Sequence, residues 1–511
     1  MTFHSILFDR TEDGIKEETL EAPAFFADLY LDQIIDTITC GRDAYNLRPF
    51  FYTPLHDIGT IQYRHEIMKD LEDNTVLEHI KSFSSNMRTM RSHLNLSENL
   101  YYRHQQQGWF LDAVRLYCDA VTGLAHDLST VELNSSGLLA FREYMIHYVK
   151  SDHFAAITEE TEKLIADLSS VKYCLLIKGN GIKVSKYEYE IDYSAEVEKT
   201  FEKFKQGAVT DYRIKFSNWP DMNHVEAKVL ELVAKLHPDI FLYLDAYCAR
   251  NAGFIDETIG VFDRQIQFYV AYLEYMMIFK RAGLRFCYPQ ISNKSKEVYD
   301  YQAFDLALAY KLITERSSIV CNDFYLKDRE RIMVVSGPNQ GGKTTFARAF
   351  GQLHHLASMG CPVPGREAQL FLFDKLFTHF EKEENIKNLR GKLQDDLVRI
   401  YHILNQATSD TIIIMNEIFT STTLEDAVFL GKEIVKKIIE LDLLCVFVTF
   451  IDELASLSDK TISMVSTVDS ENPVLRTYKI IRKAADGCSY AISIAEKHRV
   501  TYDYLRERIK S

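Results

Sequence analysis

Apolar residues recur every three or four positions over about residues 15–170, with few glycine or proline interruptions. Phe25 and Leu29 are examples of this spacing. Such a pattern lines apolar side chains along one face of a helix, so it predicts a helical region. The same period returns over about residues 222–285, where the segment that begins at Phe262 is apolar around much of its circumference, as in a helix buried between others.

The pattern changes between about residues 171 and 215. Two β-type runs flank the sequence Lys178-Gly179-Asn180-Gly181, in which glycine and asparagine supply the positive φ angles that a tight hairpin needs. We therefore predict a small β insertion at 171–215 within the helical region.

Beyond about residue 300, short β-branched runs alternate with helical segments. The runs are residues 332–335, 412–415 and 443–450. Alternation of this kind is typical of a parallel sheet with helices on its faces. The expected fold class is α/β, with a mainly helical domain at 1–300 that carries the β insertion and a sheet domain at 301–511.

The composition changes what the chain is expected to bind. Of its 511 residues 47% are hydrophobic and 26% are charged, as in ordinary compact proteins. Lys and Arg number 59 against 73 Asp and Glu, a net charge of −14. This balance argues against a protein that coats nucleic acid or an anionic membrane through bulk charge, so any such contact is expected to be local.

The cysteines and the apolar runs bear on location. Nine cysteines are scattered without a Cys-x-x-Cys pair, which favours reduced thiols over a disulfide framework or a zinc site. The N-terminus has no basic start followed by a long apolar stretch, and the longest apolar runs are too short to span a bilayer. We expect a cytoplasmic protein with no membrane partner.

Residues 337–344 fit the pattern GxxxxGK[ST], with an expected strand before them and an expected helix, 345–359, after them. In such a loop the backbone amides converge on phosphate oxygens, Lys343 reaches the β and γ phosphates, and the Thr344 hydroxyl binds Mg²⁺. An ordinary strand-to-helix turn is the alternative. The expected ATP-binding residues are Gly337, Pro338, Asn339, Gln340, Gly341, Gly342, Lys343, Thr344 and Thr345.

A second motif follows the apolar run 412–415, which ends in Asn416 and Glu417. A carboxylate at the end of such a strand normally holds the water shell of magnesium, and the next acid can orient the attacking water. Glu417 is the candidate base, with a structural strand-end carboxylate as the alternative. Asn416 stands where an Asp is expected, so it brings an amide oxygen but no negative charge to the metal.

Lysines near the predicted hairpin are candidate contacts for a DNA phosphate backbone. Acidic residues such as Glu188 are interleaved with them, so a solvated hairpin is the alternative and the one that the pattern favours. The candidates are Lys178, Lys183 and Lys186, together with Lys203 and Lys205.

Several motifs in residues 318–510 resemble the ATPase domain of the MutS family of mismatch-repair proteins. GPNQGGKTT is similar to that family's GPNMGGKST, CNDFYL places Asn322 at a family asparagine, and NEIFTSTTLEDA keeps Glu417 and Asp426. Near the end, DGCSYAISIAEKHRV is similar to an element that helps two ATPase domains pair. The resemblance implies a C-terminal P-loop ATPase of the ABC type that forms a homodimer.

The resemblance extends weakly upstream. The segment from YLDQIIDTITCGRD to IMKDL is similar to the opening of the family's helical core and lever, and the predicted β insertion stands where that family inserts its DNA-clamp domain. No N-terminal segment corresponds to the family's mismatch-reading domain. The resemblance therefore implies a MutS-like ATPase without the N-terminal mismatch-recognition domain.

Four departures from the family pattern bear on activity. Asn416 replaces the magnesium-side Asp, and Phe450 replaces a His that can sense the γ-phosphate, which together imply slow hydrolysis. Gly391 and Lys392 stand where the family has a Ser-Thr pair that reaches the partner's nucleotide, so Lys392 or Arg390 is the candidate donor instead. The loop after Glu417 has Phe419 and Thr420 in place of Gly and Arg.

The function expected from these observations is an ATPase that binds and hydrolyses ATP with Mg²⁺ to switch a dimeric clamp acting on branched or mismatched DNA. Lys343 and Glu417 are its candidate catalytic residues. Two alternatives stay open: an ATPase acting on RNA or a ribosome-bound complex, and a weakly hydrolysing, nucleotide-gated scaffold for a protein partner.

Overall fold

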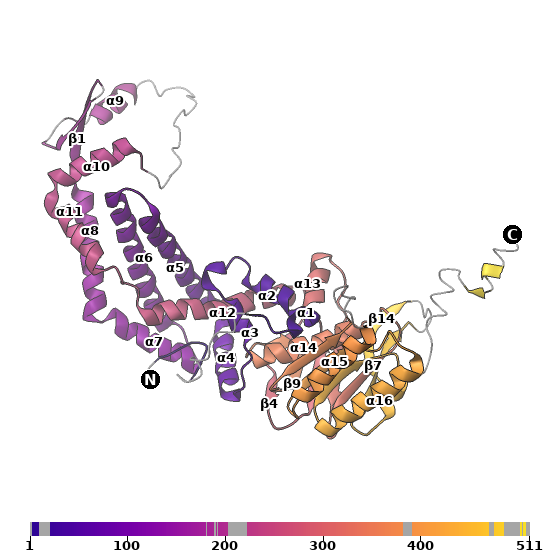
Figure 1. The fold of residues 1–511 in the computed structure, drawn as a ribbon. Helices are drawn as coiled ribbons and strands as arrows, with labels where there is room; N and C mark the ends of the chain where they lie inside the picture. The colour runs from indigo at the N-terminus through magenta and orange to yellow at the C-terminus, as the bar shows by residue number, and fades with distance from the viewer. Residues whose placement is uncertain are drawn as a thin grey trace. The chain divides into compact units, whose positions relative to one another are not determined.

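The computed structural model describes residues 3–9, 21–179, 181–188, 191, 193–202, 222–381, 391–469, 475–484, 501–502 and 504–506. The chain forms two compact units (Figure 1). One unit comprises Met1–Phe3, Asp73–Leu133 and Leu138–Asp263, and the other His4–Glu72, Asn134–Gly137 and Arg264–Ser511. Neither unit is continuous in sequence, unlike the domains 1–300 and 301–511, which stay a prediction.

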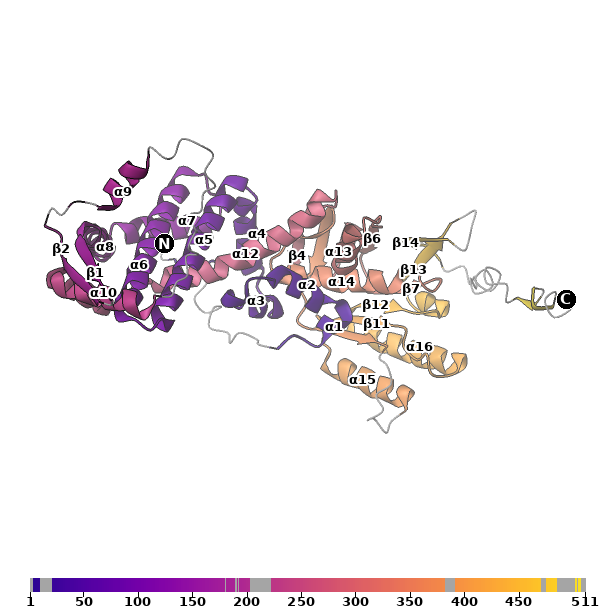
Figure 2. The same ribbon diagram turned by 90° about the horizontal axis from the view of Figure 1, so that it is seen from above.

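The first unit is built mainly from helices, as the helical period predicts. Its central pair is α5, Asn74–Asn99, and α6, Arg103–Thr130, which lie side by side (Figure 2). Asp73 caps α5 by accepting a hydrogen bond from the Thr75 amide at 2.7 Å. Around this pair lie α7 (Ser136–Val149), α8 (Asp152–Ser170), α10 (His224–Leu236), α11 (Pro238–Arg250) and the first residues of α12 (Glu257–Arg281).

The predicted hairpin is present in this unit. Strand β1, Tyr173–Lys178, pairs antiparallel with β2, Gly181–Lys186, and Gly179 in the turn has φ 59°. Helix α9, Tyr193–Glu202, follows the hairpin within the predicted insertion at 171–215. Val197 and Phe201 lie four residues apart in this segment, a helical spacing. Residues 203–215 lie outside the described part of the chain.

The second unit begins with a short N-terminal segment that side chains hold in place. The hydroxyls of Tyr63 and Tyr269 donate to the backbone oxygens of Ser5 and Ile6 at 2.7 and 2.6 Å. Ile6 is fully buried. The helices that follow are α1 (Phe25–Leu29), α2 (Leu31–Thr39), α3 (Arg48–Tyr52) and α4 (Ile58–Leu71).

A six-stranded sheet forms the core of the second unit, in the order β10-β11-β12-β7-β13-β14. All neighbours are parallel except the edge pair β13–β14, which is antiparallel. The carboxyl ends of the parallel strands therefore meet at one edge of the sheet. The strands are β7 (Ile332–Ser336), β10 (Leu376–Phe380), β11 (Ile412–Asn416), β12 (Leu444–Val448), β13 (Thr461–Val468) and β14 (Arg476–Arg482).

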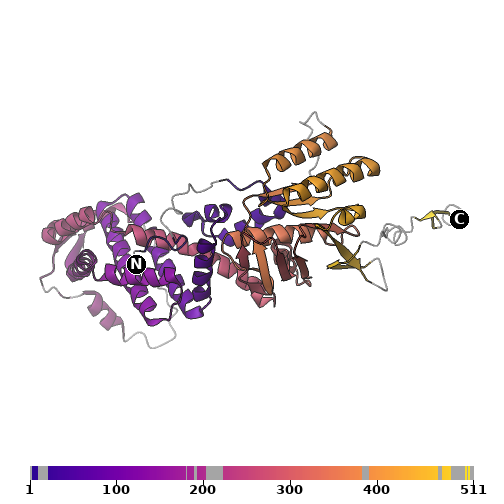
Figure 3. The same ribbon diagram turned by 90° about the horizontal axis from the view of Figure 1, so that it is seen from below.

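Helices cover both faces of this sheet (Figure 3). Ile413 and Met415 of β11 pack in a cluster with α15, Lys392–Gln406, and α16, Leu424–Leu441. On the other face lies α14, Lys343–Ser358, whose Gly351 is so close to Ile414 that a Cβ there would meet its Cδ1 at 2.7 Å. Alternate residues of one strand thus serve opposite helix layers, as the period of a strand requires.

Smaller sheets complete the second unit. Their strands are β3 (Phe286–Cys287) with β8 (Val363–Pro364), and β4 (Gln290–Ser292), β9 (Glu367–Phe371), β5 (Val298–Ala303) and β6 (Asn322–Leu326) in that spatial order, with α13 (Leu306–Thr314) following β5. None of the described helices is long and apolar enough to cross a membrane.

Candidate functional site

The glycine-rich loop 337–342 joins the buried strand β7 to helix α14, at the carboxyl edge of the parallel sheet. Gly337 has φ 118° and Gly342 has φ 91°, angles that side chains with a Cβ rarely adopt. Gln340 has φ 59° without being glycine. The loop therefore turns tightly onto the first turn of α14, where free backbone amides and the helix dipole favour an anion.

Ser466 of β13 closes the loop from the side. Its hydroxyl donates to the Gly341 oxygen at 2.7 Å and is fully buried. A Cβ on Gly341 would meet the Ser466 hydroxyl at 2.3 Å and the Pro338 oxygen at 2.9 Å. Glycine at 341 is therefore required by close approach, and sequence reasoning missed Ser466 because nothing in its surroundings resembles a motif.

Lys343, the first residue of α14, is only 4% exposed. Its ammonium donates to the Gly337 oxygen at 3.0 Å and lies 3.5 Å from the Glu417 carboxylate. Burial lowers the pKa of Lys343, whereas the Glu417 charge raises it. The ammonium is thus held inside the loop by groups that a phosphate can replace as partners.

The end of β11 faces the start of α14. The Thr344 hydroxyl donates to Asn416 Oδ1 at 2.9 Å, and Asn416 is 8% exposed. Glu417 follows with φ 51°, an angle that is rare outside glycine, and its amide donates to the Val448 oxygen at 3.0 Å. This turn directs the carboxylate back toward Lys343. The structure therefore brings together four residues that the sequence singled out: Lys343, Thr344, Asn416 and Glu417.

These side chains fit a magnesium ion that is shared with a nucleotide. Thr344 and Asn416 offer neutral oxygens and Glu417 a carboxylate, and oxygen ligands are what Mg²⁺ prefers. Among the described residues, no group of three or more His, Cys, Asp or Glu side chains could hold a metal on its own. Phosphate oxygens and water would therefore have to complete the coordination, as is usual for magnesium bound with ATP.

One further residue near the loop, Arg476, escaped sequence reasoning. The positive charge of Arg476, on β14, further lowers the pKa of Lys343. Asn322 receives a hydrogen bond from the Ile480 amide at 2.8 Å and donates to the Tyr478 oxygen at 3.2 Å. Asn322, which the sequence did single out, thus holds β14 beside β6, and β14 in turn places Arg476.

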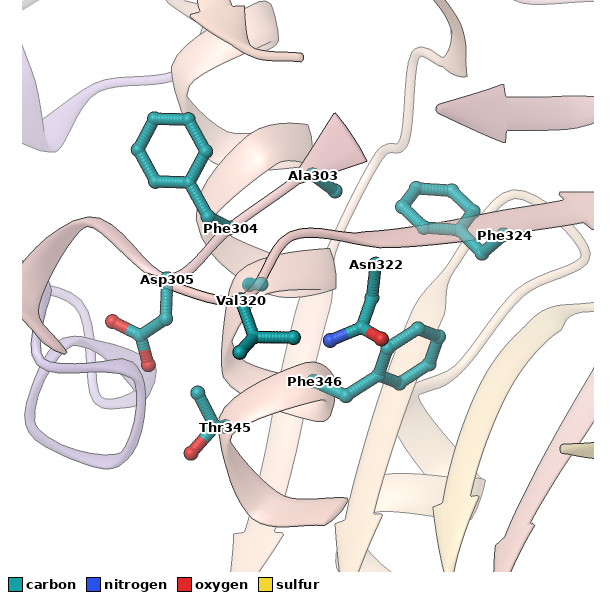
Figure 4. A pocket seen from close by; sticks show the side chains of 9 residues that line it. Ala303, Phe304, Asp305, Val320, Asn322, Phe324, Thr345 and Phe346 are labelled. Carbon is teal, nitrogen blue, oxygen red and sulfur yellow. The ribbon is translucent and has the colours of Figure 1, made fainter. Parts of the chain in front are cut away.

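A small pocket of about 20 Å³ adjoins the first turn of α14 (Figure 4). Thr345 and Phe346 of α14 line one side, and Val320 and Asn322 line another. Its volume is close to that of a single water molecule. The remaining lining residues are Ala303, Phe304, Asp305, Phe324 and Ala349.

Lys392 and Thr420, two of the positions that depart from the family pattern, both contact Glu381. Lys392 contacts the Glu381 carboxylate, and the Thr420 hydroxyl donates to it at 3.0 Å. Gly391 is the N-cap of α15 and makes no side-chain cap. Phe419 is buried, with φ 62°. Arg390 lies outside the described residues.

Two other positions that the sequence singled out, Phe450 and Asp426, lie at the end of a strand and at the start of a helix. Phe450 follows β12 and is 52% exposed. Asp426 accepts from the Thr423 hydroxyl at 2.9 Å at the start of α16, so it is part of a helix cap. The segment 486–500, similar to the family's pairing element, lies outside the described residues.

The candidate DNA contacts lie on the hairpin of the first unit. Lys178 ends β1, while Lys183 and Lys186 lie on β2, and all three are exposed. Lys203 and Lys205 lie outside the described residues.

Comparison with known proteins finds a family similar to the sheet region of the second unit. The family model for MutS domain V matches residues 333–507. These residues begin in β7 and include the glycine-rich loop, Asn416 and Glu417. The chain is therefore MutS-like in its C-terminal part.

Its relatives carry the name DNA mismatch repair protein MutS. The protein from Orientia tsutsugamushi (strain Boryong) is 32% identical over 218 residues, covering 41% of this chain and 24% of the relative. That from Thermosipho melanesiensis is 28% identical over 186 residues, or 35% of this chain and 22% of the relative. The protein from Chlorobium chlorochromatii is 25% identical over 294 residues, which cover 56% of this chain and 33% of the relative. The chain thus spans a third or less of the length of these relatives.

Proposed function

We propose that the chain is a MutS-like ATPase that binds Mg²⁺-ATP at the loop 337–345 and hydrolyses it slowly. The observation that carries this proposal is the meeting of two pairs at one edge of the sheet. Lys343 faces Glu417 at 3.5 Å, and Thr344 donates to Asn416 at 2.9 Å. A bound γ-phosphate would fall between the loop amides and the end of β11, where both pairs lie.

Each residue then has a defined task. The backbone of residues 337–342 and Lys343 neutralise charge that develops on the phosphates, and Thr344 and Asn416 orient the metal and its water. Glu417 accepts a hydrogen bond from the attacking water and takes its proton. Thr344 and Asn416 would hold Mg²⁺, which would supply positive charge to stabilise the charge that develops on the phosphates.

Slow turnover follows from Asn416. An amide oxygen attracts Mg²⁺ less than a carboxylate does, because it carries no net charge. The hydrogen bond from Thr344 uses one of the two lone pairs of Asn416 Oδ1, which leaves the other for a metal-bound water. Phe450 offers no proton or charge at the end of β12.

The name of the relatives extends the proposal to DNA and to a second copy of the chain. We propose that two copies pair through their ATPase regions, with Lys392 as a cation offered to the partner's nucleotide. Lys392 stands at a helix N-terminus, where a positive charge opposes the dipole, and Glu381 offsets that opposition. The ligand proposed is branched or mismatched DNA, whose grip ATP binding would change.

A second candidate function, a nucleotide-gated scaffold, is favoured by Asn416 and Phe450. With Asn416 and Phe450 the site can hold nucleotide yet turn it over hardly at all, which suits a nucleotide-gated scaffold for a protein or a ribosome–RNA partner. Binding energy alone would then shift the protein between states.

Steady-state ATP hydrolysis by the wild-type chain separates the two candidates. It is measured with and without matched duplex, mismatched duplex and four-way-junction DNA, at two salt concentrations. Turnover that one DNA form raises, and that salt suppresses, supports the ATPase acting on DNA. ATP binding without turnover under every condition supports the scaffold.

A further inference from the structure

The turn that carries Glu417 has a backbone that its own sequence does not favour. Glu417 has φ 51° and Phe419 has φ 62°, angles in the left-handed region that favours glycine. The MutS-family pattern has glycine at the position of Phe419. Glycine adopts this angle without strain, whereas phenylalanine has to be held there by contacts with the rest of the protein.

Contacts along the turn 417–420 supply this hold. At its start, the Glu417 amide donates to the Val448 oxygen at 3.0 Å. In its middle, Phe419 is 1% exposed and packs in the cluster with α15 and α16. At its end, the exposed Thr420 donates through its hydroxyl to Glu381 Oε1 at 3.0 Å. The end of the turn is therefore fixed by a residue that directly follows another strand, β10.

Glu381 is itself fixed by a cation. The Lys392 ammonium, at the start of α15, donates to the same Oε1 atom. This hydrogen bond lowers the pKa of Glu381, so the carboxylate stays ionised and accepts both hydrogen bonds. The side chains of Glu381 and Lys392 are 42% and 24% exposed, and ion pairs this open to solvent add little to stability. The contribution of the pair is therefore expected in the geometry of the turn.

We propose that Glu381 is a positioning residue for Glu417, which it aims at the ATP site by holding Thr420 at the end of the strained turn. The inference rests on the proposed ATPase function and extends it to a residue outside the phosphate-binding loop. Without this hold the turn can relax and carry the Glu417 carboxylate away from Lys343, which now lies 3.5 Å from it. A displaced base slows the reaction steeply, because proton transfer needs hydrogen-bond distance.

The sheet register argues against a direct role for Glu381 at the metal. Phe380 of β10 pairs with Asn416 of β11, so Glu381 lies at the same edge of the sheet as the ATP site. However, Asn416 contacts Thr344 of α14, whereas Glu381 contacts Lys392 of α15. Helices α14 and α15 cover opposite faces of the sheet (Figure 3). The Glu381 carboxylate therefore reaches the turn and not the Thr344–Asn416 pair.

Phosphate release and Mg²⁺-ATP binding by the full chain test the inference. Glu381→Ala removes the acceptor, and Thr420→Val removes the donor with little change in side-chain size. Glu381→Gln is the conservative variant, because its amide oxygen can still accept from Thr420. The control is Glu453→Ala, which removes an exposed ion pair with Lys432 that does not involve the turn.

Glu381→Ala and Thr420→Val should each lower kcat by roughly tenfold and change the Kd of Mg²⁺-ATP by less than about twofold, because the phosphate-binding loop is intact. The double variant should be no slower than either single variant, since both break the same contact. Glu381→Gln should keep most of the rate, and Glu453→Ala should match the wild type. Hydrogen–deuterium exchange of the peptide that contains Glu417 should be faster in Glu381→Ala, since its turn opens more often.

Three outcomes would overturn the inference. If the wild type and Glu381→Ala hydrolyse ATP at the same rate, Glu381 does not position the base, although the proposed ATPase function stands. If Glu381→Ala loses ATP binding together with turnover, its effect is a general disturbance of the site. If the wild type binds ATP but does not turn it over, the hydrolysis part of the proposed function fails and the inference fails with it, while the ATP site stands.

Discussion

The carboxyl edge of the parallel sheet and the β1–β2 hairpin place their candidate ligand-binding side chains in opposite environments. At the sheet, Lys343 is 4% exposed and is already fixed by the Gly337 oxygen and Glu417. On the hairpin, Ile177 is 70% exposed and Lys178 and Lys183 extend from a two-stranded sheet. The side chains at the sheet edge are already held by protein groups, whereas those on the hairpin are open to solvent. Substitutions should therefore affect chemistry and loop geometry in the first and only DNA binding in the second.

The largest effect is expected from Glu417→Gln. Loss of the carboxylate removes the proton acceptor but keeps the shape of the side chain, so turnover should fall by about 10²–10⁴-fold while ATP affinity changes little. Phosphate release and ATP binding are measured on the same preparation. Glu433→Gln, on exposed α16, is the matched control. Unchanged turnover in Glu417→Gln would remove Glu417 as the base.

A smaller but clear effect is expected from Gly341→Ala. The added Cβ would meet the Ser466 hydroxyl at 2.3 Å and the Pro338 oxygen at 2.9 Å, so the loop must shift. Mg²⁺-ATP affinity should fall by roughly tenfold. Adding Ser466→Ala removes the hydroxyl from the clash and should restore part of the ATP affinity. Recovery should be incomplete, because the contact with the Pro338 oxygen persists. Gly253→Ala, with open space around the new Cβ, should bind as the wild type does; equal affinity in Gly341→Ala would show that the loop does not bind the nucleotide.

Arg476→Gln should weaken ATP binding by several-fold at most. Arg476 is close enough to Lys343 to lower its pKa, so it adds positive potential where phosphates would lie. Its effect should shrink as salt rises, because the charge is partly exposed. Titration at two salt concentrations measures this, with Arg329→Gln on an exposed loop as the control. An effect independent of salt would point to a structural role.

Asn416→Asp tests the magnesium side of the site. A carboxylate in place of the amide should lower the Mg²⁺ concentration needed for half-maximal ATP binding by several-fold. The hydrogen bond from Thr344, at 2.9 Å, would persist with either an amide or a carboxylate at residue 416. A change in the magnesium titration would therefore report the added negative charge. A magnesium titration that does not change would show that residue 416 is remote from the metal.

The smallest effects should come from the hairpin. Lys178→Gln/Lys183→Gln should change the free energy of unfolding by no more than about 0.5 kcal/mol, because both side chains are exposed. ATP turnover without DNA should also match the wild type. Thermal unfolding and phosphate release check both expectations. A large loss of stability would mean that the hairpin is structural, contrary to the comparison of the two regions.

The strands and loop of the ATP site were predictable because their signals are local. The buried strand 332–335 and the strand 412–415 read as short β-branched runs, and the structure has β7 and β11 there. Ser466 and Arg476 were not predictable, since they come to the loop from strands far along the chain and match no motif. Tertiary contacts, not sequence patterns, place them.

The sequence was also misleading where burial depends on the whole unit. His354 and His355 are adjacent on α14, where a helix that packs along one face would expose one of two neighbours, yet both are buried. The reason is that α14 lies between the six-stranded sheet and α1, with which it packs. Burial lowers the pKa of each histidine to about 4.

Equilibrium binding of Mg²⁺-ATP to the wild type and to Lys343→Ala, measured by isothermal titration calorimetry, tests the central claim most directly. Lys437→Ala, an exposed lysine of α16, controls for loss of charge. The account predicts binding by the wild type and by Lys437→Ala, and none that is detectable by Lys343→Ala with its fold intact by circular dichroism. Equal affinity of Lys343→Ala and the wild type would contradict the assignment of the loop 337–345 as the ATP site.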